Sequence, residues 1–235
     1  MIPVISAAAP SLTLQLGNGL TKPSQSILVI LALTLLSVAP SLLILLTGFT
    51  RIVIVLSLTR QALGLPTVPP NQVIAGLALF LSLFIVAPTL TQMNKVGLQP
   101  YLHGKETAVQ AYKAAEVPLK TWMLRQTRTS DLSMMTSAAH QKAVVPAGGS
   151  VRAADVSLAT LIPAFLLSEI KSAFIIGFVI FVPFLVIDLV VSSILMSMGM
   201  MMLPPTLVSL PFKLLLFVLV DGWTLVVHSL IVSFR

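Results

Sequence analysis

The sequence predicts an all-α, integral-membrane-type protein of about four long, kinked apolar helices, arranged as two helical hairpins with a soluble, partly helical insert between them. Two observations lead to this prediction. Hydrophobic residues make up 57% of the 235 residues and charged residues only 9%, against roughly 25% charged residues in ordinary soluble domains. Long apolar runs that could form membrane spans lie on both sides of one polar stretch, residues 94–157.

The composition also excludes several kinds of chemistry. The chain has no cysteine, so disulfides, thiolate catalysis and iron–sulfur clusters are excluded. Its three histidines are scattered, and the phosphate-binding pattern GxxxxGK followed by Ser or Thr is absent. The formal charge of +7 points to anionic headgroups or a wet basic surface rather than to nucleic acid. We therefore expect no cofactor, metal, catalytic residue or nucleic-acid partner, and we do not expect an enzyme.

The first predicted hairpin covers residues 27–93 and follows an N-terminal tail, residues 1–26. Its first helix begins near Ile27 and has Pro40 in its middle, where we expect a break or kink. Because apolar residues follow Arg51, this helix is expected to run on past it. An arginine in such a helix must reach water, meet an acid or face another subunit.

A proline-rich turn, residues 64–70, separates this helix from the second one. Asn71 is a plausible cap, and the second uncharged segment runs from there to about Met93.

The insert, residues 94–157, differs from the rest of the chain in composition. Together with the three residues before it, it holds eight of the fourteen Lys and Arg residues and four of the seven acidic residues. One or two amphipathic helices are expected near Glu106–Glu116 and Pro118–Thr127, followed by a flexible loop from Ala143 to Val151.

The second predicted hairpin covers residues 158–235, with a methionine-rich stretch at or near its turn. Residues 196–202 contain five methionines and one glycine, and Pro204 and Pro205 follow closely. Two consecutive prolines cannot continue a helix from the preceding turn, and Gly199 permits a backbone bend. Pro183 marks another expected break in the apolar helix that precedes this stretch.

Several charged residues interrupt the apolar helices of this hairpin. Each would cost roughly 2.5–3.5 kcal/mol in the middle of a bilayer on a lone helix, so these groups must pair, face water or face another subunit. Glu169 and Lys171 are two positions apart and point to different sides of a helix, so they are not expected to pair. Glu169 or Asp188 is expected to pair with Lys213, within or between subunits, as a static bridge or as part of a proton relay. Asp221 is the fifth such charge.

An ordered series of motifs resembles the FliP family. The resemblance covers about residues 30–93 and 158–230. The motifs are Phe49-Thr-Arg-Ile52, Arg60-Gln-Ala-Leu-Gly-Leu65, Pro69-Pro-Asn-Gln-Val73, Ala75-Gly-Leu-Ala-Leu-Phe80, Pro163-Ala-Phe-Leu-Leu-Ser-Glu169-Ile-Lys171, Pro183-Phe-Leu-Val-Ile-Asp188, Met196-Ser-Met-Gly-Met-Met-Met-Leu-Pro-Pro205 and Ser209-Leu-Pro-Phe-Lys213 through Asp221-Gly-Trp223.

This resemblance implies a core subunit of the flagellar type III protein export gate, in the bacterial inner membrane within the flagellar basal body. Several copies would join FliQ, FliR and FlhB family subunits, largely on the periplasmic side, in a helical spiral around a pore. Unfolded export substrates would pass through this pore. The resemblance also implies a methionine gasket that closes the pore, formed by Met198, Gly199, Met200, Met201 and Met202. It further implies contacts between neighbouring subunits made by Arg51, Glu169, Lys171, Asp188, Lys213 and Asp221.

Three alternatives remain open at this point, and one of them is a purely structural scaffold without a pore. A small proton-coupled secondary transporter could use Glu169 and Asp188, but it would be expected to contain an internal repeat with matched broken helices. The two hairpins are only loosely similar, and the charges gather in one of them. An injectisome homologue of the export gate shares the motifs, and physical reasoning does not separate the two branches.

Overall fold

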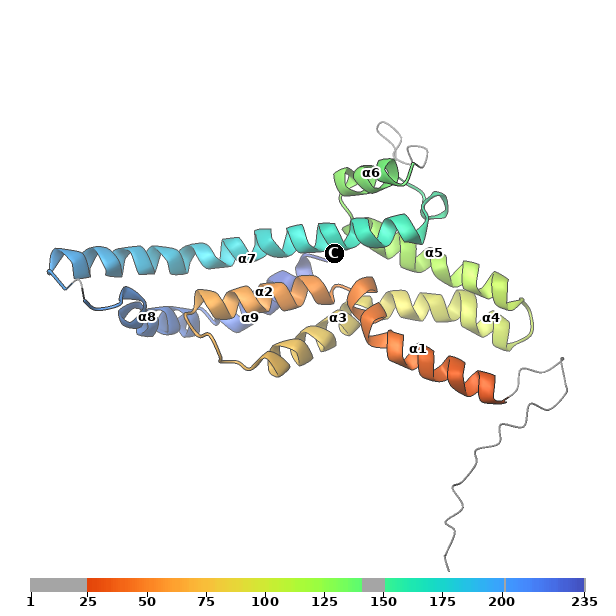
Figure 1. Cartoon of the computed structure of the whole chain (residues 1–235), viewed down its shortest axis with the longest axis horizontal. Coiled ribbons are helices and arrows are strands. Elements are labelled where there is room, and N and C mark those ends of the chain that lie inside the picture. The colour runs from red at the N-terminus through yellow and green to blue at the C-terminus, as the bar shows by residue number, and fades with distance from the viewer. Residues whose placement is uncertain (1–24, 141–150, 201, 235) are drawn as a thin grey trace, which may run out of the picture. The chain divides into compact units, whose positions relative to one another are not determined.

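The computed structural model describes residues 25–140, 151–200 and 202–234, and these residues form helices and turns without any strand (Figure 1). The all-α prediction is confirmed, since 83% of the described residues are helical. The chain divides into two compact units, residues 1–40 and 41–235. In the first unit, the described residues all belong to α1 (Gln25–Leu46). The expected tail, residues 1–26, lies almost entirely outside the described part of the chain.

Among the described residues, two helices are long and apolar enough to cross a membrane, Asn71–Leu102 with 32 residues and Leu158–Ser197 with 40 residues. Two bent helix pairs raise this number to four if each pair counts as one span. This range includes the predicted number of about four long apolar helices.

The helix through Arg51 is not continuous with α1, contrary to the expectation from the sequence. α1 ends at Leu46, and α2 (Phe49–Ala62) begins after a bend of 82°. At the bend, Gly48 touches the ring of Phe234: a Cβ on this glycine would lie 2.4 Å from Cζ of the ring. The bend therefore needs a residue without a side chain at position 48, and it lets the chain pass closely over Phe234.

The second helix of the first hairpin extends beyond its expected end at Met93. α3 (Asn71–Met93) continues through a π-helical turn, η1 (Asn94–Leu98), into α4 (Gln99–Leu102). Pro88 lies inside α3 and does not end it. Gly97 allows close packing of this extension on α5, since a Cβ there would lie 2.8 Å from the carbonyl oxygen of Ala111. Part of the predicted insert is thus an extension of the first hairpin.

Of the one or two amphipathic helices expected between residues 106 and 127, the structure has one, α5 (Ala108–Gln126), with Pro118 inside it. Thr107 begins α5 with a capping box, in which its hydroxyl accepts from the backbone N–H of Gln110 while the Gln110 side chain accepts from the N–H of Thr107. Packing against α3 and η1 offsets the hydrogen bond lost at the proline. A second helix, α6 (Thr129–Ala138), packs on α7. The expected loop at 143–151 lies outside the described residues except for Val151.

The last part of the chain forms three helices. α7 (Leu158–Ser197) continues through Pro183, and α1 continues through Pro40, so neither proline ends its helix. A kink at these prolines stays a prediction. α8 (Pro205–Leu219) and α9 (Gly222–Val232) follow, with a bend of 64° between them.

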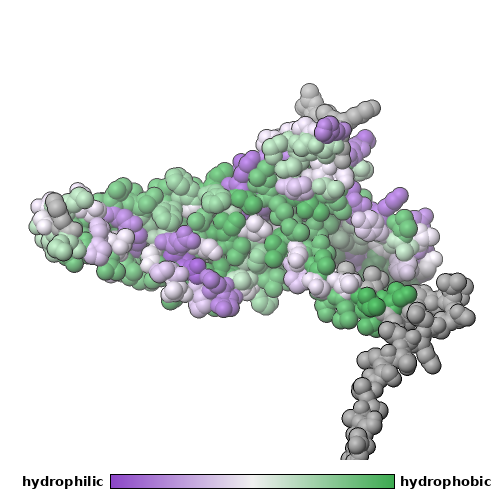
Figure 2. All heavy atoms as spheres, in the orientation of Figure 1, coloured by the Kyte–Doolittle hydropathy of each residue, from purple (hydrophilic) through white to green (hydrophobic). Residues whose placement is uncertain are grey.

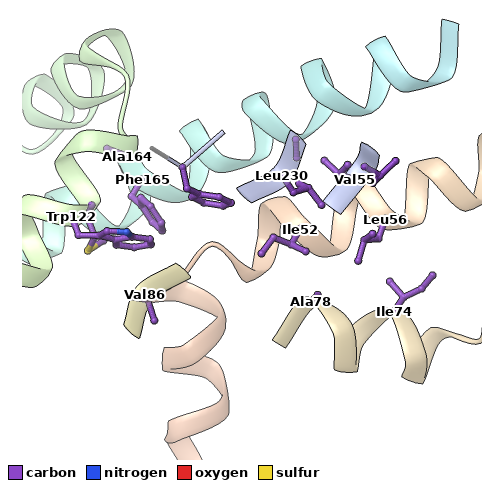
Figure 3. Packing of buried hydrophobic residues seen from close by; sticks show 14 of the residues in the cluster. Ile52, Val55, Leu56, Ile74, Ala78, Val86, Trp122, Ala164, Phe165 and Leu230 are labelled. Atoms are coloured by element: carbon purple, nitrogen blue, oxygen red, sulfur yellow. The ribbon is translucent and has the colours of Figure 1, made fainter. Parts of the chain in front are cut away.

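The core lies where α2 packs along α7, with α3 on another side of α2 (Figure 1). Ile52, Val55 and Leu56 of α2 are fully buried in this core, and Phe165 of α7 lies 5.3 Å from the Trp122 ring of α5 between centroids (Figure 3). Close approach of α2 and α7 requires a glycine: a Cβ on Gly177 would lie 2.3 Å from Cδ1 of Leu58.

Much of the apolar surface is not covered by the chain itself. Only 11% of the most apolar stretch of α7 is buried, and Figure 2 shows hydrophobic residues over much of the visible face. Exposed apolar surface on this scale marks contact with lipid or with other protein chains.

Candidate functional site

Arg51 joins four helices at the buried centre of the protein. Its Nε donates to Oε2 of Glu169 on α7 at 3.0 Å, and its Nη2 donates to Oε1 of the same carboxylate. Nη2 also donates to Oε1 of Gln126 at the end of α5 at 3.1 Å. Nη1 donates to the backbone oxygen of Ser233, after α9, at 2.8 Å and to its hydroxyl at 3.1 Å. All five guanidinium N–H groups therefore have acceptors.

Two further contacts complete this cluster. The guanidinium of Arg51 lies 4.0 Å from the centroid of the Phe234 ring, and Nε2 of Gln126 donates to the backbone oxygen of Phe234 at 2.9 Å. Arg51 and Glu169 are both fully buried. The Arg51 cluster is therefore a buried bidentate ion pair, and acceptor groups at the ends of neighbouring helices bind the remaining guanidinium donors.

A second ion pair ties the insert to α7. Lys171 donates to Oδ1 of Asp131, and Oδ2 of Asp131 lies 2.8 Å from the hydroxyl of Ser168. The backbone N–H of Arg128 also donates to that hydroxyl at 3.0 Å. Burial raises the pKa of the Asp131 carboxyl, but the hydrogen bonds from Lys171 and Ser168 and the charges of Lys171 and Arg128 outweigh it. The net effect places the pKa of Asp131 below its ordinary value.

This lowered pKa predicts a stability that depends on Asp131 in acid. A carboxylate with a depressed pKa in the folded state stabilises the fold above its unfolded pKa, near 4, and this contribution is lost as pH falls through the folded value. We expect the free energy of unfolding to decline below about pH 4, and Asp131→Asn to make this decline shallower while lowering stability at neutral pH. Denaturation of the detergent-solubilised protein between about pH 7 and pH 2 measures both effects.

Asp155→Asn is the matched control, because Asp155 forms only an exposed pair with Arg152, at 2.9 Å. An acid-dependent decline that is equally steep in the Asp131→Asn protein would contradict the prediction.

A third ion pair joins the two helices on either side of the methionine stretch. Lys213 of α8 donates to Oδ2 of Asp188 on α7 at 2.7 Å, and the hydroxyl of Ser209 donates to Oδ1 at 2.6 Å. The sequence offered Glu169 and Asp188 as partners of Lys213, and in the structure Lys213 pairs with Asp188. The fifth charge, Asp221, is exposed, adopts a left-handed conformation with φ of 51° before α9, and forms no ion pair with a described residue.

Compensation of these charges does not require another subunit. The sequence left open whether the buried charges pair within or between chains, and here Arg51, Glu169, Lys171, Asp188 and Lys213 all have partners in the same chain. Glu169 and Lys171 pair with different residues, as expected. A role of these residues and Asp221 in subunit contacts stays a prediction.

Sequence reasoning missed several partners in these clusters: Gln126, Asp131, Ser168, Ser209, Ser233 and Phe234. Most of them lie far along the chain from the groups they bind, and the sequence carries no local signal for such pairings. Ser209 also binds a distant residue, Asp188, but it lies one helical turn before Lys213, so its place on the same helix face could have been read from the sequence.

The methionine stretch links the end of α7 to α8, and it begins with a helix-terminating motif. Gly199 has φ of 73°, the left-handed conformation that favours glycine. Its N–H donates to the oxygen of Met196, and the N–H of Met200 donates to the oxygen of Leu195. This is the Schellman pattern, which satisfies two of the free carbonyls at a helix end. The helix therefore ends at Ser197, close to the bend expected at Gly199.

The other end of the link is formed by the two prolines. Pro204 has an extended conformation, and Pro205 is the first residue of α8. At that position a backbone N–H would have no acceptor within the helix, so the missing N–H of proline removes no helical hydrogen bond. Met198 is 66% exposed and Met202 is 98% exposed. Met201, one of the predicted gate residues, lies outside the described residues. In the methionine link, residues 198–204, the side chains of Met198 and Met202 are therefore exposed and do not pack in the core of their own chain.

Comparison with known proteins decides the family. The sequence model of the FliP family matches residues 32–230. The chain belongs to the FliP family. Flagellar biosynthetic protein FliP of Bacillus subtilis is 54% identical over 90% of this chain and 93% of the relative. Those of Aquifex aeolicus and Pectobacterium carotovorum are each 46% identical, over 96% and 100% of this chain and 92% and 89% of the relatives.

The match to the FliP family includes all three ion pairs and the methionine link. It begins before Arg51 and ends at residue 230, just before Ser233 and Phe234, which complete the Arg51 cluster. No group of three or more His, Asp or Glu side chains that could hold a metal occurs among the described residues.

Proposed function

We propose that this chain is the core pore-forming subunit of the flagellar type III protein export gate, with the methionine link closing the pore. The observation that carries the proposal is the exposed methionine link at the end of a 40-residue apolar helix, in a chain whose relatives are named flagellar biosynthetic proteins. The link does not serve the stability of the single chain, because the side chains of Met198 and Met202 pack against little of it.

The proposed mechanism is gating by apolar, adaptable side chains. A narrow ring of thioethers resists wetting, so it hinders ion leak while no substrate is present. Methionine has three rotatable bonds, and its side chain can move aside for a polypeptide of any sequence. Energy for transport must come from other components, because the chain carries no nucleotide-binding motif.

The uncovered apolar surface supports an assembly of several chains. α7 exposes large hydrophobic side chains along most of its length, among them Phe174, Phe178, Val179 and Leu189. Several copies, together with FliQ, FliR and FlhB family subunits, would cover this surface in a spiral around the pore. This assembly belongs to the bacterial inner membrane at the flagellar basal body, largely on its periplasmic side. The relatives support the flagellar branch over the injectisome branch, since each is named a flagellar protein.

Replacement of Met200, Met201 and Met202 by alanine tests the gasket. In a complex formed with co-expressed FliQ and FliR proteins and reconstituted into bilayers, we expect the triple variant to raise ion conductance while leaving the native mass of the assembly unchanged. The reason is that alanine leaves an opening where thioethers had excluded water. Planar-bilayer current recordings measure the conductance.

Met134→Ala is the matched control, because Met134 is an exposed methionine in α6, outside the link. Unchanged conductance in the triple variant would contradict the gasket. A native mass of one or two chains, even with the partners present, would instead contradict the export gate and favour a small transporter.

A further inference from the structure

An apolar pocket of about 420 Å³ lies among α2, α3, α8 and α9. Its walls include Leu56 and Leu63 of α2, Ile74 and Leu77 of α3, Phe217 of α8 and Trp223 of α9. Every other lining residue is apolar as well, and the outer members Val68, Val73 and Val218 are well exposed. The pocket therefore opens through an apolar rim and offers no polar group that would hold a water-soluble ligand.

Arg60 does not line this pocket itself, but it is hydrogen-bonded to Pro69, which does. It is four residues after Leu56 and three before Leu63, so the three side chains share one face of α2. Nη1 of Arg60 donates to the backbone oxygen of Pro69, itself a pocket residue, at 3.0 Å, and to Oδ1 of Asn71 at 2.7 Å. These two contacts hold the guanidinium beside the opening.

The remaining donors of Arg60 are not used by the described part of the protein. Its Nε is buried and has no hydrogen-bond partner there, and no acidic residue forms an ion pair with it. Arg51, the other arginine of α2, has an acceptor for every donor. Nη2 forms no hydrogen bond with a described residue and, unlike Nε, is not buried, so it is the donor that an incoming acceptor can reach. An oxyanion is the acceptor that best matches such a cation.

We propose that this pocket binds one acyl chain of a phospholipid, whose phosphate accepts hydrogen bonds from Arg60. Arginine matches phosphate oxygens with parallel donors, and an apolar pocket matches a hydrocarbon chain. Figure 2 shows hydrophilic residues gathered at the α2–α3 turn beside apolar surface, an arrangement that suits the boundary between headgroups and acyl chains. With no acid paired to Arg60, a headgroup without a cation, such as phosphatidylglycerol, is preferred over phosphatidylcholine.

Trp223 provides a direct readout, because it lines the pocket. The chain has two tryptophans, and the Trp122→Phe background leaves Trp223 as the only one. The full-length protein, alone and in its assembly with partner subunits, is reconstituted into bilayers with a small fraction of lipid brominated in the acyl chains. Bromine quenches tryptophan fluorescence on contact, so the quenching reports acyl chains beside Trp223.

We expect brominated phosphatidylglycerol to quench Trp223 several-fold more effectively than brominated phosphatidylcholine at equal fraction. Arg60→Gln should abolish this preference, and Val73→Phe, which places a ring at the rim, should reduce quenching by both lipids. Lys95→Gln is the matched control, since it removes one exposed positive charge near the other end of the same hairpin and should leave the preference intact.

Equal quenching of Trp223 by the two brominated lipids in the protein with an unaltered pocket would overturn the proposal, whatever the pocket variants show. Loss of quenching once the partner subunits are bound would also overturn it, since a protein segment would then fill the pocket.

Discussion

Replacement of Arg51 by methionine is expected to lower the free energy of unfolding by about 3–5 kcal/mol. The substitution leaves Glu169 as a buried carboxylate without its partner, and it also removes the donors that Gln126 and Ser233 use. Breaking a buried pair from one side costs more than the pair contributes, because the remaining charge stays desolvated. Urea or SDS titration of the detergent-solubilised protein, followed by helical circular dichroism, measures the change.

The double variant Arg51→Met with Glu169→Leu separates the cost of a lone charge from the value of the pair. Replacement of both partners by apolar residues of similar volume is often neutral, so the double variant should recover much of the stability lost in the single variant. If both variants are equally unstable, the hydrogen bonds to Gln126 and Ser233 carry the stabilisation instead of the ion pair.

Reversal of Lys213 to glutamate is expected to have the second largest effect. Lys213 is buried and pairs with Asp188, so the reversal places two carboxylates together between α7 and α8. Loss of a buried pair costs about 3–5 kcal/mol, and the cost here should fall toward the lower end because Asp188 remains 27% exposed. We expect lower stability and weaker oligomers, measured by denaturation and by native gels.

The exchanged variant, Asp188→Lys with Lys213→Glu, shows which contact matters for assembly. It restores the pair within the chain but reverses the charge that each position would present to a neighbouring subunit. Recovery of both stability and assembly would show that Lys213 acts inside its own chain, against the predicted subunit contact. Recovery of stability without assembly would support that contact.

The parts of the fold that depend on local sequence could be predicted well. The hydrophobic runs predicted the long helices, and the prolines at 66, 69 and 70 predicted the position of the turn between α2 and α3. The end of α7 was also predictable, because Gly199 and the two following prolines carry their conformational preferences in any context.

The remaining features depend on contacts between distant segments. The bend at Gly48 exists because the Phe234 ring occupies the place of a side chain, which no local pattern reveals. Pro118 and Pro183 remain inside helices, where packing outweighs the local preference to end them. The same reason explains why Asp131 was not identified as the partner of Lys171, 40 residues away.

The Arg51 cluster also constrains how the protein is made. When α2 leaves the ribosome, none of the acceptors for its arginine has been synthesised: Gln126, Glu169 and Ser233 all come later. The nascent first hairpin must therefore carry an uncompensated cation until α7, which contains Glu169, has emerged. Until then water, lipid phosphates or the insertion machinery must solvate that charge.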